Sequence, residues 1–134
     1  MKYISTRNSS KEFNFSEVFI KGLADDGGLY VPKSLKKYTT EELVELKNLS
    51  YNELSTEIIN LFSADFISRE KLSSLIKKSY STFREKEVVK ISIVGELKLL
   101  ELFHGPTLAF KDVAMQFIGN LYEYYLSKNN KKIN

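Results

Sequence analysis

The sequence contains no cysteine and only one histidine among its 134 residues. Without cysteine, the chain has no disulfide framework, no thiolate metal ligand and no cysteine nucleophile. A single histidine also argues against a histidine-based metal site, which needs several such ligands. We therefore expect no metal centre.

Long apolar runs and strong charge are also missing. No stretch approaches the roughly 18 apolar residues that a membrane-spanning helix needs, and the opening "MKYISTRNSSKE" lacks the hydrophobic core of a signal peptide. The net charge of +3 is too small to indicate nucleic-acid binding, and the one basic cluster, Lys128 to Lys132, contains no aromatic residue. We expect a cytoplasmic protein that binds neither membrane nor nucleic acid.

What is present is enough for one modest core, because 43% of the residues are hydrophobic and 28% are charged. The segment "MKYISTR" has the loose alternation of a short strand, and "GLYVP" forms a second one that we expect to pair with it. Between them, Phe15, Val18, Phe19 and Leu23 recur at helical spacing before the stop signal "DDGG".

Three helices are predicted in the middle of the chain, over 40–48, 51–62 and 69–81. Thr39 followed by Glu42, and Ser50 followed by Glu53, have the spacing of capping boxes, in which each side chain bonds the other residue's backbone N–H. Ser68 begins the third helix. The apolar stripes of these helices are typical of a core, and we assign them no role in function.

The last fifty residues change character. After the charged "REKE", which resembles a linker, "VVKISIV" and "LKLLELF" predict two strands joined by a turn near Gly95. Helical spacing then runs from Phe110 to Leu126. The chain is therefore predicted to be an α/β protein, predominantly helical with short strands: a small α+β module, then the first strand, loop and helix of an incomplete α/β domain.

The loop "HGPTLAFKD" contains the candidate site. Gly105–Pro106 ends the strand, and we expect Thr107 to cap the helix, which places Lys111 in its first turn. The positive end of the helix dipole disfavours a charged amine there. If Leu108 and Phe110 enclose the amine, desolvation acts in the same direction. A neutral amine is what Schiff-base chemistry requires.

Pattern alone leaves simpler interpretations open. A lysine at a helix start is commonly a solvated cation, and a single histidine such as His104 commonly satisfies a local hydrogen bond. Asp112 has the position of an ordinary helix-start carboxylate. The "DDGG" segment does not match a phosphate-binding loop, because a strand rather than a helix follows it.

The same loop carries a family resemblance. "ELFHGPTLAFKD", Glu101 to Asp112, resembles the cofactor-lysine segment of the threonine synthase family, pyridoxal-phosphate enzymes of the tryptophan-synthase-β-like fold (fold type II). "MKYISTR" followed by "FSEVFIKGLADDGGLYVP" is similar to the N-terminal extension of that family. The resemblance implies that residues 1–83 form the family's N-terminal domain and residues 84–134 the truncated start of its catalytic domain.

The resemblance also implies a function in threonine biosynthesis. Members of the family are lyases that convert O-phospho-L-homoserine and water to L-threonine and phosphate. Lys111 would form the Schiff base with pyridoxal phosphate and move protons at the substrate's α and β carbons. Phe110 would pack beside the cofactor, Asp112 would shape the helix start next to it, and His104 and Thr107 would line the site.

Two departures limit this expectation. The opening "STR" is followed in the family by glycine and here by Asn8, and the chain is far shorter than family members. The glycine-rich loop for the cofactor phosphate and the contact to the ring nitrogen are not in this sequence, so the complete cofactor site is not present. We expect the 134 residues alone to be inactive and to need association with the remaining catalytic portion.

Other interpretations stay open alongside an N-terminal portion of threonine synthase. The chain could be a non-catalytic, free-standing binding or assembly domain, or part of a threonine-synthase-like phospholyase with another substrate. We also expect that the last helix, without the sheet that covers it in the family, exposes an apolar patch: Val113, Phe117, Leu121 and the group of Tyr122, Tyr124 and Tyr125.

Overall fold

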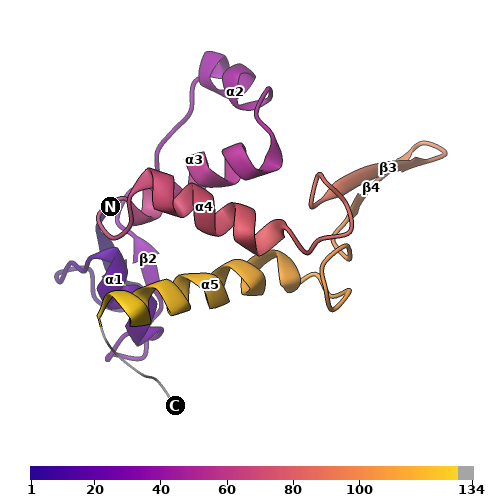
Figure 1. Cartoon of the computed structure of the whole chain (residues 1–134). Helices are drawn as coiled ribbons and strands as arrows, with labels where there is room; N and C mark the ends of the chain where they lie inside the picture. The colour runs from indigo at the N-terminus through magenta and orange to yellow at the C-terminus, as the bar shows by residue number, and fades with distance from the viewer. Residues whose placement is uncertain (130–134) are drawn as a thin grey trace. The chain divides into compact units, whose positions relative to one another are not determined.

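The computed structural model describes residues 1–129, which form two compact units (Figure 1). Unit 1 comprises Met1–Leu49 and Glu53–Leu72, and unit 2 comprises Ser50–Asn52 and the chain from Ser73 onward. The division passes through two helices rather than through the charged segment near residue 84. A domain boundary at residue 83 therefore stays a prediction.

Unit 1 begins with the strand pair that the sequence predicts. Strand β1 (Tyr3–Ser5) runs antiparallel to β2 (Tyr30–Pro32), with Tyr3 opposite Pro32. Helix α1 (Phe15–Lys21) lies between them in sequence and begins at a capping box of Asn14 and Glu17. The helix ends at Gly22, whose φ of 72° favours glycine.

One residue of the predicted α1 face lies outside the helix. Because Gly22 ends α1, Leu23 does not continue the apolar face, and it is 63% exposed. Val18 of α1 is buried in unit 1 together with Phe66, Ile67 and Leu72. The half-buried rings of Phe15 and Phe19 stack at 5.6 Å, and Phe66 lies 5.6 Å from Phe15. The Tyr3 hydroxyl donates to the Phe62 carbonyl at 2.9 Å, and burial, aided by Asp65, raises the pKa of Tyr3 to about 12.

The three middle helices occur close to their predicted ranges. They are α2 (Thr40–Leu46), α3 (Tyr51–Ser63) and α4 (Arg69–Tyr80). The predicted capping box of Thr39 and Glu42 is formed in both directions. Ser68 caps α4 by accepting a hydrogen bond from the Lys71 N–H at 3.3 Å.

In unit 2, helix α5 (Asp112–Lys128) contacts the C-terminal half of α4. The Tyr80 hydroxyl donates to the Val113 carbonyl at 2.9 Å, and the Asn120 amide donates to the Ser79 hydroxyl at 3.0 Å. Phe117 and Leu121 are buried, at 8% and 2% exposure, and Val113 is half-buried. The tyrosines of the expected patch, Tyr122, Tyr124 and Tyr125, are half-buried as well. The expectation that α5 exposes these side chains is therefore wrong.

The hairpin of unit 2 also follows the prediction. Strands β3 (Lys90–Val94) and β4 (Leu97–Glu101) pair antiparallel around the turn at Gly95, whose φ is 62°. Within unit 2 the hairpin projects away from α5 (Figure 1). Ile91, Ile93 and Leu100 share one face, and Val94, Leu97 and Leu99 share the other, and all six are exposed. The hairpin is thus apolar on both faces.

No helix within residues 1–129 is long and apolar enough to cross a membrane. The same residues contain no group of three or more histidine or acidic side chains that could hold a metal ion. The predicted basic cluster lies, beyond its first two residues, outside the described part of the chain.

Candidate functional site

The candidate site is the loop of residues 102–111, which joins β4 to α5 in unit 2. The helix begins at Asp112, two residues later than the spacing predicts, and Lys111 is its N-cap residue with φ −60° and ψ −25°. Lys111 therefore stands at the edge of the helix rather than within its first turn. Thr107 is not the N-cap, because turns over residues 106–111 separate it from the helix.

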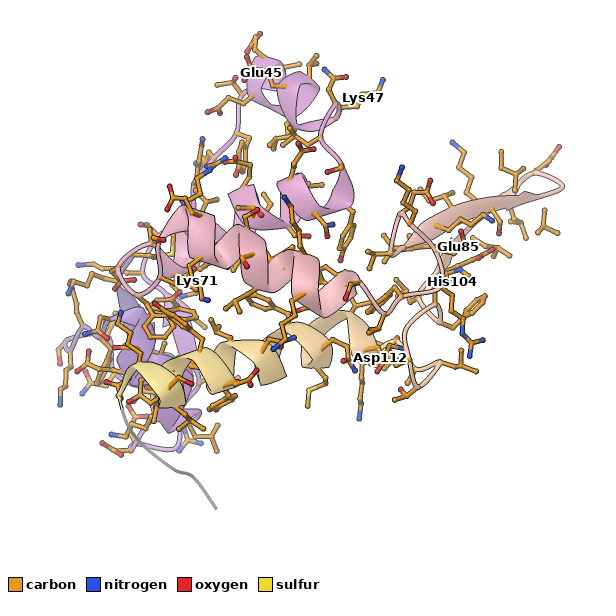
Figure 2. All side chains as sticks on the ribbon, viewed as in Figure 1. Glu45, Lys47, Lys71, Glu85, His104 and Asp112 are labelled. Carbon is orange, nitrogen blue, oxygen red and sulfur yellow. The ribbon has the colours of Figure 1, made fainter. Side chains whose placement is uncertain are left out.

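Thr107 instead holds the carboxylate of Asp112. The Thr107 backbone N–H donates to one Asp112 oxygen at 2.7 Å, and its hydroxyl lies 2.9 Å from both oxygens. Gln116, one turn into α5, donates a longer bond of 3.4 Å to the same carboxylate. The loop is thereby tied to the first turn of the helix that follows, at Asp112, which Figure 2 labels.

Burial and hydrogen bonding have opposite effects on Asp112, which is 3% exposed. Burial on its own raises the pKa of the carboxyl group, but the hydrogen bonds from Thr107, Gln116 and the loop backbone outweigh it and hold the pKa below its ordinary value. Asp112 is thus a fully partnered carboxylate whose geometry suits a structural role at the helix start.

Gly105 makes room for this arrangement. A Cβ atom at this position would lie 2.3 Å from the Cβ of Asp112 and 2.5 Å from its Oδ2, closer than real atoms approach. The absence of a side chain at residue 105 therefore lets the loop close on the carboxylate. The sequence shows this glycine only as a strand breaker, because its partner is seven residues away.

The side chains around Lys111 are open. Leu108, whose φ of 62° places it in the left-handed region, is 51% exposed, and Phe110 is 65% exposed. These two residues therefore do not enclose the amine in the described chain, and the condition for desolvating it is not met there. Within residues 1–129, Lys111 is exposed and its amine makes no hydrogen bond or ion pair. The amine is therefore accessible from solvent.

His104 is paired with a residue that the sequence did not single out. Its Nε2 lies 2.6 Å from a carboxylate oxygen of Glu101, the last residue of β4, and the two side chains are 12% and 19% exposed. The His104 carbonyl also accepts a hydrogen bond from the Arg84 N–H at 2.9 Å. Figure 2 shows His104 in the loop that precedes Asp112.

Glu101 is held as a carboxylate. Hydrogen bonds from the Ser92 hydroxyl and from His104 lower its pKa, as does the charge of Lys90 across the strand pair. The i, i+3 spacing of Glu101 and His104 was the signal available in the sequence. A glutamate in an apolar strand with a histidine beyond its end is too common a pattern to stand out.

The structure thus joins Thr107 to Asp112 and His104 to Glu101. It links neither Lys111 nor Phe110 to these pairs through a side-chain hydrogen bond among the described residues. Chemically, the loop offers a free primary amine, an imidazole held by a carboxylate and an exposed aromatic ring. A free amine fits a cofactor that is bound through an aldehyde.

A sequence model described as "Threonine synthase N terminus" matches residues 2–80. This chain belongs to the threonine synthase N-terminal family. The match covers more than half of the chain, and threonine synthases resemble it beyond that range. The threonine synthase of Schizosaccharomyces pombe is 43% identical over 97% of the chain, and that of Saccharomyces cerevisiae is 45% identical over 98%.

Solved threonine synthase structures share the fold as well as the sequence. A PLP-bound threonine synthase from Brucella melitensis superposes with a TM-score of 0.92 at 37% identity over 98% of the chain. The yeast threonine synthase superposes with a TM-score of 0.91 at 43% identity over 99%. These superpositions support the predicted fold class, an α/β arrangement with short antiparallel strands.

The relatives are much longer than this chain. It spans 26% of the Schizosaccharomyces pombe protein, 27% of the Saccharomyces cerevisiae protein and 29% of the Brucella melitensis chain. A threonine-synthase-like 2 protein of Xenopus laevis is also 38% identical over 99% of the chain, and the match covers 29% of that protein. Membership of the family is therefore clear, whereas the activity of the whole relatives extends beyond what these residues contain.

Proposed function

We propose that this chain is the N-terminal portion of a threonine synthase that converts O-phospho-L-homoserine and water to L-threonine and phosphate. The observation that carries the proposal is the resemblance to threonine synthases over 97–99% of the chain, which includes the loop with Lys111. The TM-score of 0.92 to a PLP-bound member adds support at the level of the fold.

Lys111 is the residue that we propose to hold pyridoxal phosphate. The cofactor, when bound, supplies an aldehyde for the amine and a ring that accepts electrons from the substrate. The unpaired amine of Lys111 would bind the cofactor and then carry protons. Phe110, the preceding residue, is 65% exposed and would offer a ring face to the cofactor, and Thr107 with Asp112 would hold the loop in position.

The described residues supply only part of a cofactor site. The sequence has six glycines, and those with positive φ, Gly22, Gly27 and Gly95, lie at a helix end and in separate turns. They do not form the cluster of backbone N–H groups that a phosphate requires. We infer that the phosphate is held by the remaining catalytic portion, whether it continues this chain or is a separate polypeptide.

We propose that the remaining catalytic portion covers the hairpin. The hairpin is apolar on both faces, so it cannot bury both of them against a single layer within unit 2. The relatives that share this fold extend over about three and a half times its length, so their additional residues are the natural occupant. The proposed domain boundary at residue 83 would place the hairpin at the start of the catalytic domain.

Trapping with borohydride tests the role of Lys111. The chain is incubated with pyridoxal phosphate, alone and together with a separately expressed remaining portion of a yeast threonine synthase, reduced, and mapped by peptide mass spectrometry. We expect label at Lys111 in the mixture, and none when Lys111→Arg replaces the wild type. Lys47→Arg, an exposed lysine at the C-terminal end of α2, is the matched control and should leave the labelling unchanged. Label at another lysine with Lys111 bare would refute the assignment.

Activity is measured in the same mixtures. We expect release of phosphate from O-phospho-L-homoserine only when both portions are present, and threonine formation by residues 1–134 alone would refute the expected inactivity. The resemblance to threonine-synthase-like 2 proteins favours a second candidate, a phospholyase with another substrate. That candidate predicts label at Lys111 without threonine formation. A free-standing binding domain predicts neither.

A further inference from the structure

The pair of Glu101 and His104 carries an inference of its own. His104 is the only histidine in the sequence, and it lies on the same loop as Lys111. Its Nε2 lies 2.6 Å from Glu101, and within residues 1–129 Nδ1 has no hydrogen-bond partner. The two ring nitrogens are thus placed in different surroundings.

The charge of Glu101 decides which nitrogen carries the proton. An ionised carboxylate only accepts hydrogen bonds, so the short contact to Glu101 requires a proton on Nε2. Ser92 and Lys90 act with His104 to keep the Glu101 carboxyl ionised, because all three lower its pKa. In neutral His104 the lone pair is then on Nδ1.

The hairpin fixes this contact in space. Glu101 ends β4 opposite Lys90, and Ser92 lies on the same face of the neighbouring strand. The Arg84 N–H holds the His104 carbonyl at 2.9 Å, which anchors the backbone of the histidine as well as its ring. Both partners are therefore anchored by backbone pairing before any ligand arrives.

We propose that Glu101 is a positioning residue that keeps neutral His104 as the Nε2–H tautomer and so makes Nδ1 the proton-accepting nitrogen of the Lys111 loop. The proposal rests on the proposed function only in taking this loop as the place where protons are exchanged. It adds a second basic group to the loop beside the amine of Lys111.

Nitrogen-15 NMR of the histidine ring tests the proposal directly. Because His104 is the only histidine, labelling with ¹⁵N-histidine gives a single pair of ring nitrogen signals from the intact 134-residue chain. At a pH where the ring is neutral, we expect Nε2 to carry the proton and Nδ1 to have the signal of a bare nitrogen. A ring with its proton on Nδ1 in the wild type would overturn the proposal without any variant.

Glu101→Gln tests the part played by the carboxylate. The amide of glutamine can both accept and donate, so it can pair with either tautomer, and we expect the single-tautomer signature to be lost. Glu96→Gln, at the exposed turn of the same hairpin, is the matched control and should keep the wild-type signature. An unchanged tautomer in folded Glu101→Gln would refute the role of Glu101. If Glu101→Gln does not fold, a proton on Nδ1 in the wild type would still refute the proposal.

The outcomes separate this proposal from the proposed function. The ring signals require neither cofactor nor substrate, whereas labelling of Lys111 requires the cofactor. An Nε2–H tautomer that depends on Glu101, with no label at Lys111, would support the positioning role and refute the cofactor role. Label at Lys111, together with a proton on Nδ1 of His104, would support the cofactor role and refute the positioning role.

Discussion

The loop before α5 depends on a glycine whose role is steric. Gly105 faces the buried Asp112, while Gly119 lies on the exposed side of α5 with nothing within 4 Å of a Cβ at its position. Both positions lie in unit 2, ten and twenty-four residues after Gly95 at the hairpin turn. They form a matched pair in which the same methyl group should have opposite effects.

Gly105→Ala should destabilise the chain, because the added Cβ must push the loop away from Asp112. We expect a loss of about 1–3 kcal/mol in the free energy of unfolding, the usual cost of forcing extra volume into a packed site. Gly119→Ala should instead add about 0.5–1 kcal/mol, because alanine loses less conformational freedom in a helix. Urea unfolding followed by circular dichroism measures the free energy of unfolding of both variants. A Gly105→Ala variant as stable as the wild type would contradict the steric argument.

Asp112 should make the stability of the chain depend on pH in acid. Its pKa in the folded chain lies below the ordinary value of 3.8, so the unfolded chain binds this proton more readily than the folded chain does. The stabilisation is complete above the ordinary value and is lost as the pH falls from 3.8 toward the folded pKa. We expect Asp112→Asn to melt well below the wild type at pH 7, with a smaller difference at pH 3.

Thermal unfolding of the two proteins at both pH values checks this expectation. Glu45→Gln, an exposed substitution on α2, is the control and should shift the melting temperature little at either pH. A difference between Asp112→Asn and the wild type that stays constant from pH 7 to pH 3 would show that the effect is not ionic.

At the scale of elements, local sequence signals predicted which helices and strands form better than they predicted the residue at which each one begins or ends. The Thr39 and Glu42 box was readable because both partners lie within four residues, and the structure forms it. Gly22 ends α1 one residue before Leu23, which periodicity alone could not show. In the candidate site, the positions of Lys111 and Asp112 beside the helix start could be predicted. The Thr107 contact could not, because it depends on the turns between them.

Helix α2 offers a direct test of a cap. It is seven residues long and contains no buried residue, so its stability depends largely on its ends. Thr39→Ala removes the side-chain acceptor and should cost about 1 kcal/mol, which corresponds to about fivefold faster exchange of the α2 amides. Thr40→Ala, the next residue and exposed, is the control. Equal exchange in the two variants, measured by mass spectrometry, would contradict the capping role.

At the scale of the whole molecule, contacts between residues far apart in the sequence determine the division into units and the burial of side chains. The Tyr3 hydroxyl bonds the Phe62 carbonyl across 59 residues, and this kind of contact assigns α3 residues to unit 1. Periodicity describes one segment at a time. It therefore predicted the elements but not the division into units, nor the burial of Phe117 and Leu121.

The hairpin provides a prediction at this scale. Ile91→Lys with Ile93→Lys places two charges on one apolar face without changing the strand pairing. We expect the double variant to lose at least tenfold in affinity for the separately expressed catalytic portion, because each buried isoleucine contributes about 1.5–3 kcal/mol. Val44→Lys, on an exposed apolar side chain of α2, should bind as the wild type does. Isothermal titration measures the affinities, and undiminished binding by the double variant would exclude the hairpin as the docking surface.

The hydrogen bond between the Arg84 N–H and the His104 carbonyl has a practical consequence. It joins the two ends of the segment that contains the hairpin, so residues 84–104 form a closed loop. Gly95, at the tip, has a φ of 62° that favours glycine, so it is kept, and residues are inserted beside it, where a Cβ on Gly95 itself would meet nothing within 4 Å. Residues inserted at the tip lengthen this loop without separating its ends. Each doubling of loop length costs only about 0.6 kcal/mol in the free energy of loop closure. The tip is therefore a suitable attachment point for a fluorophore, which could report the arrival of a partner while the Lys111 loop stays unaltered.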